Sequence, residues 1–413
     1  MRQSLRKIRT PAMAFILLMG VVSLLADMTH EGARSSLGPF LYLSGASAAA
    51  IGFVTGLGEM AGHSLRLLFG YLADRKRNYW TLVILGYAIN LLAVPALALV
   101  SENGWILAGI LIVAERTGKA IRHPAKNTLV SFASRQVGEG KAFAIQEFLD
   151  QLGAFLGPVL LFLVLQLRKG ETLLASYRIG FAWLGIPAVL TLLVLVLARR
   201  RFPAPDRFES ASPDPEPLRL RSAFLLYLAA TGLLALGFAD FPLMSMHAVR
   251  RELVAPDLVP LLYAGAMAAD AVAALLFGWL FDRFGFRVLM VSSLLSAGFP
   301  LLVFLGTSPW ALAAGVLLWG VGMGAQESIL KAAVTRLTPK ARRSTGFGVF
   351  QTSFGLFWFA GSWLMGVLYD RSLGGLVLFS TILMLLSVPV FFLAWKAMGQ
   401  NGPARPASPG TER

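Results

Sequence analysis

The chain has 413 residues, of which 56% are hydrophobic and 14% charged, and its formal net charge is +15 at pH 7. Soluble domains carry about 25% charged residues, so this composition excludes an ordinary soluble protein and indicates several membrane spans. Cysteine is absent, which excludes disulfides, thiolate metal sites and cysteine nucleophiles. The positive charge does not indicate nucleic-acid binding, because the basic residues cluster in short connections on one side of the predicted membrane.

Twelve apolar segments follow one another along the chain, each long enough to cross a hydrocarbon core about 30 Å thick. The predicted spans are 12–42, 48–72, 79–100, 105–133, 141–167, 177–198, 222–247, 257–281, 287–306, 310–336, 344–369 and 374–396. No small-residue cleavage site follows the basic N-terminus, so the first span is expected to remain as an anchor. Basic residues concentrate at the N-terminus and in the even-numbered connections, which predicts two cytoplasmic termini. We therefore expect an all-α, multi-pass protein of the inner (cytoplasmic) membrane.

The spans fall into two halves of six. We expect an N-terminal bundle at 1–198, a proline-rich cytoplasmic linker at 199–221, a C-terminal bundle at 222–398 and a disordered cytoplasmic tail at 399–413. The halves also match each other in sequence. Gly70-Tyr-Leu-Ala-Asp74-Arg75 follows the second span as Gly278-Trp-Leu-Phe-Asp282-Arg283 follows the eighth. Internal duplication of this kind is typical of transporters built from two related bundles.

A polar stripe interrupts the first span. Asp27, His30, Glu31 and Arg34 follow helical spacing, so they share one face of an otherwise apolar helix. Such groups are costly in lipid unless they face a protein or water-filled interior. The stripe is therefore the first candidate for a functional site.

Polar residues in other spans extend this candidate site. The second, fourth, fifth and tenth spans carry Glu59, His63, Arg66, Glu115, Arg116, Lys119, Arg122, Lys126, Glu147, Asp150, Gln151, Glu327 and Lys331, while Asp240 and Asp270 are single acids in the seventh and eighth. An acid beside an arginine can exchange a proton when one partner moves, so the proton-coupling candidates are Asp27, Glu31, Glu115 and Arg116. The substrate-binding candidates are His30, Arg34, Glu59, His63, Lys119, Arg122, Glu147, Asp150, Glu327 and Lys331.

Some of these residues have plainer interpretations. Arg122 and Lys126 approach the cytoplasmic end, where long side chains can reach the headgroups. Arg66 could tie the Asp74 loop to neighbouring helices. Glu327 and Lys331 stand one helical turn apart and could form a structural pair.

The loop motif after the second span of each half resembles that of the major facilitator superfamily. The second copy carries Gly278, Asp282, Arg283, Gly285 and Arg287, whereas the first has Arg77 where the family has a glycine. The resemblance implies two pseudo-symmetric six-helix bundles that work by alternating access. It also implies a conformational gating role for Gly70, Asp74, Arg75 and the second copy.

Two further motifs carry the same resemblance. Gly153-Ala-Phe-Leu-Gly157-Pro158 in the fifth span is similar to the glycine–proline motif of the family's antiporters. Glu115-Arg116-Thr-Gly118-Lys119-Ala-Ile-Arg122 resembles the fourth-span motif that is tied to proton coupling in the family. These motifs imply a proton-coupled antiporter, and they add Gly157 and Pro158 to the gating candidates.

The leading hypothesis is a secondary transporter, and not an enzyme, that exports a small polar or charged solute with protons as the coupling ion. No ATP-binding motif occurs, and we expect no cofactor, no resident metal and no nucleic-acid partner. The expected partners are the lipid bilayer and a small-molecule substrate, and the expected state is a monomer. Three alternatives remain open: a non-transporting receptor, a divalent-metal exporter, and a multidrug:proton antiporter. The metal exporter would use Asp27, His30, Glu31, Glu59 and His63, and the multidrug antiporter a lining of Phe40, Phe53, Phe143, Phe148 and Phe155.

Overall fold

The computed structural model describes residues 10–76, 78–167, 171–204, 222–338 and 343–400. Most of the predicted linker at 199–221 and nearly all of the predicted tail at 399–413 lie outside this part, so both remain predictions.

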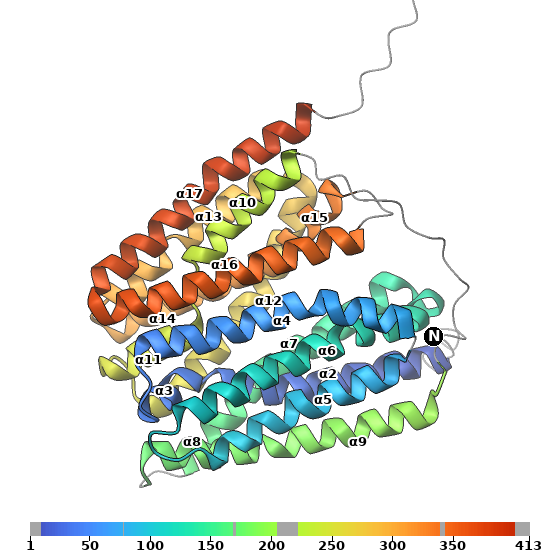
Figure 1. The fold of residues 1–413 in the computed structure, drawn as a ribbon, viewed down its shortest axis with the longest axis horizontal. Coiled ribbons are helices and arrows are strands. Elements are labelled where there is room, and N and C mark those ends of the chain that lie inside the picture. The colour runs from blue at the N-terminus through green and yellow to red at the C-terminus, as the bar shows by residue number, and fades with distance from the viewer. Residues whose placement is uncertain (1–9, 77, 168–170, 205–221, 339–342, 401–413) are drawn as a thin grey trace, which may run out of the picture.

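The first half of the chain forms the N-terminal bundle (Figure 1). Its helices are α2 (Pro11–Arg34), α3 (Leu37–Leu43), α4 (Ala48–Lys76), α5 (Tyr79–Ala96), η1 (Leu97–Leu99), α6 (Trp105–Val137), α7 (Glu139–Leu167), α8 (Leu173–Trp183) and α9 (Gly185–Arg201). Together α2 and α3, α4, α5 and η1, α6, α7, and α8 and α9 make six successive spans, close to the predicted ranges.

The second half forms the C-terminal bundle and repeats this order (Figure 1). Its helices are α10 (Ser222–Gly237), α11 (Phe241–Arg250), η3 (Pro256–Leu258), α12 (Val259–Phe284), α13 (Arg287–Ser296), η4 (Leu301–Leu305), α14 (Pro309–Ala325), η5 (Gln326–Leu330), α15 (Lys331–Leu337), α16 (Arg343–Arg371) and α17 (Leu373–Gln400). The predicted all-α class with twelve spans in two bundles is confirmed.

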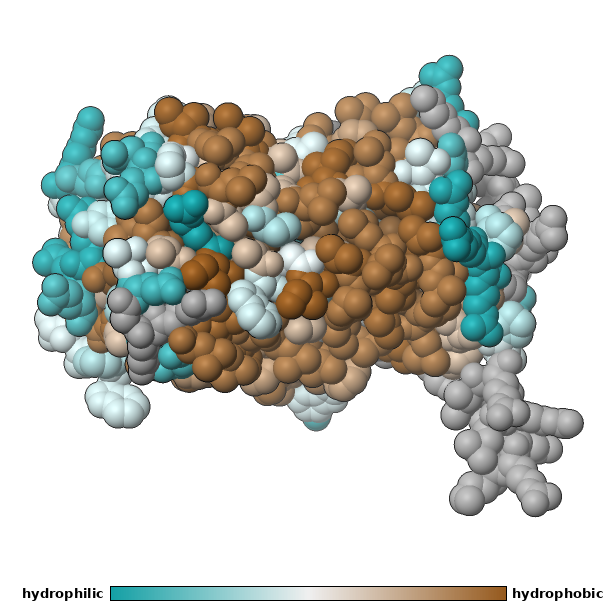
Figure 2. Space-filling model, turned by 90° about the horizontal axis from the view of Figure 1, so that it is seen from below, coloured by the Kyte–Doolittle hydropathy of each residue, from teal (hydrophilic) through white to brown (hydrophobic). Residues whose placement is uncertain are grey.

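The surface fits a membrane environment. In the described residues, eight helical spans are long and apolar enough to cross a membrane, judged by length and composition alone. The other four long segments contain α4, α6, α14 and α16: α14 is apolar but only 17 residues long, whereas α4, α6 and α16 carry more polar residues and glycines. Figure 2 shows a broad hydrophobic band between hydrophilic ends, and large side chains such as Leu275 and Trp310 are exposed on the surface. Lipid is the solvent that such a surface requires.

Capping residues explain where several helices begin. The hydroxyl of Thr10 accepts a hydrogen bond from the amide of Met13 at the start of α2, with Pro11 at the first helical position. Ser308 does the same at the start of α14, where Pro309 follows. These caps satisfy amides that would otherwise be unpaired near the membrane surface.

The first span of each half is broken in its C-terminal half, whereas the sequence predicted continuous spans. In the first half, α2 ends at Arg34 and α3 begins at Leu37. In the second, α10 ends at Gly237 and α11 begins at Phe241, with Asp240 as its N-cap. Broken helices expose backbone and side-chain polar groups within the membrane, and transporters place binding sites at such breaks.

The two bundles meet at their centre and at one end. At that end, which carries the loop 44–47, the amide of Ala49 donates to Oδ2 of Asp370 at 3.0 Å. The side-chain amide of Gln166 donates to Oδ2 of Asp257 at 2.7 Å. We call this the closed end. The opposite end carries the start of α2, and there Phe148 in the first half of α7 is 67% exposed. We call this the open end.

Candidate functional site

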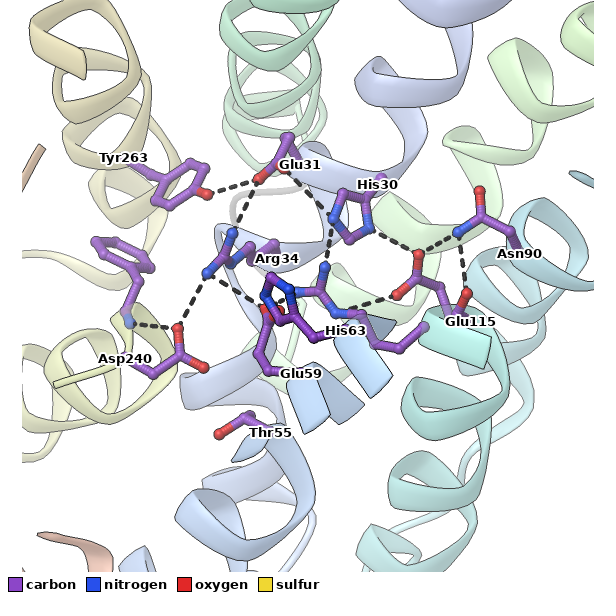
Figure 3. Close-up of polar contacts among 12 residues, drawn as sticks. His30, Glu31, Arg34, Thr55, Glu59, His63, Asn90, Glu115, Asp240 and Tyr263 are labelled. Atoms are coloured by element: carbon purple, nitrogen blue, oxygen red, sulfur yellow. Dashed lines mark hydrogen bonds and ion pairs between the residues drawn. The ribbon is translucent and has the colours of Figure 1, made fainter. Parts of the chain in front are cut away.

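A buried group of polar side chains lies where the bundles meet (Figure 3). We call it the central network, and it consists of His30, Glu31 and Arg34 of α2, Glu59 and His63 of α4, Asn90 of α5, Glu115 and Arg116 of α6, Asp240 before α11, and Tyr263 of α12. Its members on one helix are adjacent or three to four residues apart, so each helix turns one polar face toward the same place. Six chain segments therefore build one site.

His30 connects α2 with α6. Its Nδ1 lies 2.7 Å from Oε1 of Glu115, and its Nε2 lies 2.7 Å from Nη1 of Arg116. A guanidinium can only donate, so Nε2 accepts and the ring proton sits on Nδ1, where it is donated to Glu115. Asn90 donates to both the backbone and the side-chain oxygen of Glu115. The carboxylate of Glu115 is thus held from two helices besides its own.

Arg116 connects α6 with α4. Its Nη2 lies 2.8 Å from Oε1 of Glu59, and its Nε lies 3.5 Å from Oε2 of Glu115. Glu59 is also 3.5 Å from Nη2 of Arg34, and its other oxygen is 3.8 Å from Nε2 of His63. Glu59 is therefore shared by two guanidiniums and one imidazole.

Two contacts carry the central network across to the C-terminal bundle. Nη2 of Arg34 donates to Oδ1 of Asp240 at 3.1 Å, and the hydroxyl of Tyr263 donates to Oε2 of Glu31 at 2.6 Å. Asp240 also accepts from the amide of Phe241 at 2.9 Å, because it caps α11. Arg34 and Asp240 stand at the breaks of corresponding spans, so the two broken helices face each other through one ion pair.

An aromatic wall supports the C-terminal side of the network. The ring of Phe241 packs edge-on against that of Tyr263, with 4.5 Å between centroids. Trp319 is fully buried behind both rings, and its indole N–H donates to the carbonyl of Ala239 at 3.0 Å. This packing fixes the irregular backbone before α11 and therefore the position of Asp240.

Charges in the central network are not balanced. Its members are almost fully buried, apart from His63, whose side chain is 23% exposed. The acids are Glu31, Glu59, Glu115 and Asp240, and the arginines are Arg34 and Arg116. Buried charge is costly without compensation, so the surplus of acids favours the uptake of protons or of a cationic group.

Other predicted residues form a second cluster closer to the open end. Nζ of Lys126 lies 3.7 Å from Oδ1 of Asp150 and donates to Oγ of Ser23. The guanidinium of Arg122 stacks on the ring of Tyr87 at 4.2 Å. These contacts support a structural contribution of both cations and give no support to headgroup contact.

Asp27 and Lys119 belong to the same region. The charges of Lys119, Arg122 and Asp150 act on Asp27. Within the described chain, neither Asp27 nor Lys119 forms a hydrogen bond or ion pair. The predicted stripe on α2 therefore divides: His30, Glu31 and Arg34 enter the central network, whereas Asp27 faces the second cluster. We define the second cluster as Asp27, Lys119, Arg122, Lys126 and Asp150.

Three substrate-binding candidates lie outside both groups. Glu147 of α7, Glu327 of η5 and Lys331 of α15 are exposed at the open end. The charges of Glu327 and Lys331 act on Glu147 from the other bundle. Glu327 and Lys331 form no ion pair with each other among the described residues, so the structural pairing considered from the sequence is not observed.

The gating candidates on the C-terminal bundle lie at the open end of α12. Oδ1 of Asp282 is 3.8 Å from Nη2 of Arg336, which connects α12 with α15. Gly285 ends α12 with φ +62°, a conformation that favours glycine. Gly278, Arg283 and Arg287 lie in the same stretch of chain, and the guanidinium of Arg287 covers the ring of Trp395 at 5.1 Å.

The N-terminal copy of the motif is described only in part. Gly70 of α4 faces Pro124 of α6, and Arg75 is exposed. The side chain of Asp74 and the whole of Arg77 lie outside the described residues, so the conformation of this loop stays a prediction.

Gly157 and Pro158 lie inside α7 where it crosses α2. A Cβ at Gly157 would collide with the carbonyl oxygen of Met28, which shows that the two helices touch through backbone. The antiporter-like motif thus holds α7 against the helix that carries His30, Glu31 and Arg34.

Sequence reasoning did not assign three members of the central network. Asp240 had a signal, because it is a single acid in an apolar span followed by Phe241-Pro242. Asn90 is a single amide in an otherwise apolar span. Tyr263 had no signal, since nothing in the sequence distinguishes its hydroxyl from that of other tyrosines. In the described residues no group of three or more His, Asp or Glu side chains could hold a metal ion.

Two helical bundles meet at a buried charged site, and a helix of each bundle is broken there. This arrangement is that of a membrane transporter and not of an enzyme. The chain belongs to the major facilitator superfamily: the family model of that description matches residues 237–413. The chain is 39% identical over 387 residues to an uncharacterized protein of Mycobacterium tuberculosis, covering 92% of this chain and 93% of the relative. It is 27% identical over 390 residues to an uncharacterized MFS-type transporter of Methanocaldococcus jannaschii, covering 90% of this chain and 92% of the relative.

The fold is also similar to solved structures. A bacterial homolog of the human lysosomal transporter Spinster, in an inward-facing and unoccupied conformation, superimposes with a TM-score of 0.73 at 16% identity. The match covers 96% of this chain and 100% of that one. At this identity the likeness concerns the fold alone.

Proposed function

We propose that the protein exports a small polar or charged solute in exchange for protons, across an inner membrane with both termini in the cytoplasm. The observation that carries the proposal is the central network, in which both bundles contribute to one buried site with more acids than arginines. Because the site joins the bundles, any rocking between them must change these contacts. A change in proton occupancy can therefore be linked to a change in conformation.

Glu31 and Asp27 are the proposed proton carriers. Glu31 accepts from Tyr263 across the bundle interface, so it loses this partner when the bundles separate. Asp27 has no hydrogen bond or ion pair among the described residues, and it belongs to the second cluster. The hydrogen bonding of Glu31 thus depends on the contact between the bundles, whereas Asp27 is free to exchange a proton with solvent at the open end.

The second cluster has the opposite balance of charge and is the proposed entry for the solute. It contains three cations against the two carboxylates of Asp27 and Asp150. Glu115 and Arg116 are the pair that links the central network to α6. Arg34, Lys119 and Arg122 would contact the solute or return the acids to their ionised form. The antiporter-like Gly157-Pro158 motif supports exchange, and hence export.

The multidrug alternative has less support. Phe40 is buried edge-on against Phe181 at 4.8 Å, and Phe53 packs on Phe359 and Trp363. These rings contribute to packing between helices. Phe148 and Phe155 are exposed, while the side chain of Phe143 lies outside the described residues.

Ligand screening by thermal shift tests the class of solute. The purified protein would be screened against polar metabolites, divalent metals and hydrophobic cations. We expect stabilisation by one polar or charged metabolite, lost in Arg122→Met and retained in Arg199→Met, which changes an exposed arginine at the end of α9. Stabilisation by many unrelated hydrophobic cations, or by a divalent metal alone, would contradict the proposal and favour the corresponding alternative.

A further inference from the structure

Asp270 is a buried acid that belongs to neither the central network nor the second cluster. It lies on α12, in the middle of a membrane span, and is 3% exposed. Its Oδ1 is buried without a hydrogen-bond partner, and within the described residues Asp270 forms no ion pair. Within the described residues, a carboxylate in this position has no paired cation to stabilise its charge.

Among the described residues around Asp270, no cation is available to pair with it. Gly324 of α14 lies directly against it, and a Cβ there would come within 2.5 Å of Oδ1. No residue of α14 is ionisable. Arg287 of α13, another helix that packs on α12, covers the ring of Trp395 instead.

The charged groups that act on Asp270 are mostly acids. They are Glu327 of η5, Glu31 of α2 and Glu147 of α7, followed by Arg34. Arg34 is already engaged by Asp240 and Glu31. Ionisation of Asp270 would therefore add a fourth negative charge to a region of low polarity, which is strongly unfavourable.

We propose that Asp270 is a proton-binding site of the C-terminal bundle, in addition to the acids on α2. The carboxylate takes up one proton to become a neutral carboxylic acid, and no other bond changes. A bound metal ion does not explain why an acid is buried here, because the described residues contain no group of three or more His, Asp or Glu side chains that could hold one. The proposal rests on the proposed function in one respect, since proton coupling gives this proton a role.

The location suggests how the proton is released. Asp270 lies on α12, which packs along α7 of the other bundle. Rocking of the bundles moves Glu31 and Glu147, which belong to the N-terminal bundle, relative to Asp270. Their separation removes negative charge from its surroundings and admits water, and both changes favour ionisation.

Infrared spectroscopy tests the protonation of Asp270 without any need for a transported solute. The full chain, reconstituted in lipid at neutral pH without added sodium, would be compared with Asp270→Asn, which has nearly the same shape. We expect the native protein to show one carbonyl stretch of a protonated carboxylic acid that the variant lacks, while any band of a protonated acid on α2 is common to both. Glu102→Gln, which alters an exposed loop acid, should retain the band.

Two results would overturn the proposal. One is the same carboxylic-acid absorption in native protein and Asp270→Asn, with both eluting as folded monodisperse species. The other is loss of the band when sodium is added at constant pH, which would assign the site to a metal cation. Absence of pH-driven solute flux would contradict the proposed function but leave this infrared result standing, so the two failures can be told apart.

Discussion

Arg116 is the residue on which the N-terminal side of the central network converges. Its guanidinium reaches Glu59, Glu115 and His30 within one buried volume. The planar five-donor group suits this task, because a lysine could not serve three partners in fixed directions. Removing it leaves two buried carboxylates without their nearest cation.

We therefore expect Arg116→Met to lower the free energy of unfolding by about 3–5 kcal/mol, the range for breaking a buried ion pair. Chemical unfolding in detergent, followed by the fluorescence of the 9 tryptophans, measures this. Adding Glu59→Gln should recover part of the loss, because one unpaired carboxylate becomes neutral. Arg199→Met is the control on an exposed arginine, and a loss no larger than in this control would contradict the assigned role of Arg116.

At the scale of residues, the sequence predicts which residues belong to the site better than it predicts which residues contact one another. Helical spacing correctly groups His30, Glu31 and Arg34, because residues three or four apart must share a face. Helical spacing could not separate Asp27 from these three residues, because a side chain one turn further along α2 faces different residues of the neighbouring helices. It could not assign Tyr263 either, because its hydrogen bond to Glu31 depends on how two halves of the chain meet.

At the scale of elements, the contact between α2 and α7 holds the polar stripe in place. Backbone meets backbone where Gly157 faces Met28 and Gly32. Only glycine allows this approach, because any Cβ at Gly157 would overlap the carbonyl of Met28.

Gly157→Ala is expected to lower the free energy of unfolding by about 1–3 kcal/mol, the cost of overpacking a tight contact. The same unfolding assay applies. Gly374→Ala is the matched control, because a Cβ at Gly374 meets no atom within 4 Å. Equal stability of the two variants would mean that the α2–α7 contact is looser than the structure shows.

The elements themselves follow closely from the sequence. Apolar length and turn residues suffice for twelve spans, because lipid forces each crossing segment to satisfy its backbone internally. The breaks before α3 and α11 could not be predicted in this way. Their irregular backbones are supported by tertiary contacts, such as the indole of Trp319 on the carbonyl of Ala239, which no local pattern contains.

At the scale of the molecule, hydrogen bonds join the two bundles at the closed end. Gln166 and Asp257 connect them there, as do Ala49 and Asp370. Alternating access requires this end to open once in each cycle. The absence of native cysteine makes the movement accessible to cross-linking.

Gln166→Cys combined with Asp257→Cys should react with a short, cleavable bifunctional thiol reagent. We expect the cross-link to abolish solute flux in proteoliposomes and reduction of the reagent to restore it, because the closed end can then separate again. Each single variant treated in the same way is the control. Full flux after complete cross-linking would contradict alternating access through this end.

The most direct measurement of the central claim is solute flux driven by an imposed pH gradient in proteoliposomes. The solute is the ligand found by thermal-shift screening, and Asp27→Asn with Glu31→Gln removes both proposed proton carriers. The account predicts that the native protein and the exposed-acid variant Glu102→Gln accumulate solute against its gradient, while the double variant does not. Unchanged gradient-driven flux in the double variant would contradict the claim that the acids of α2 couple protons to transport.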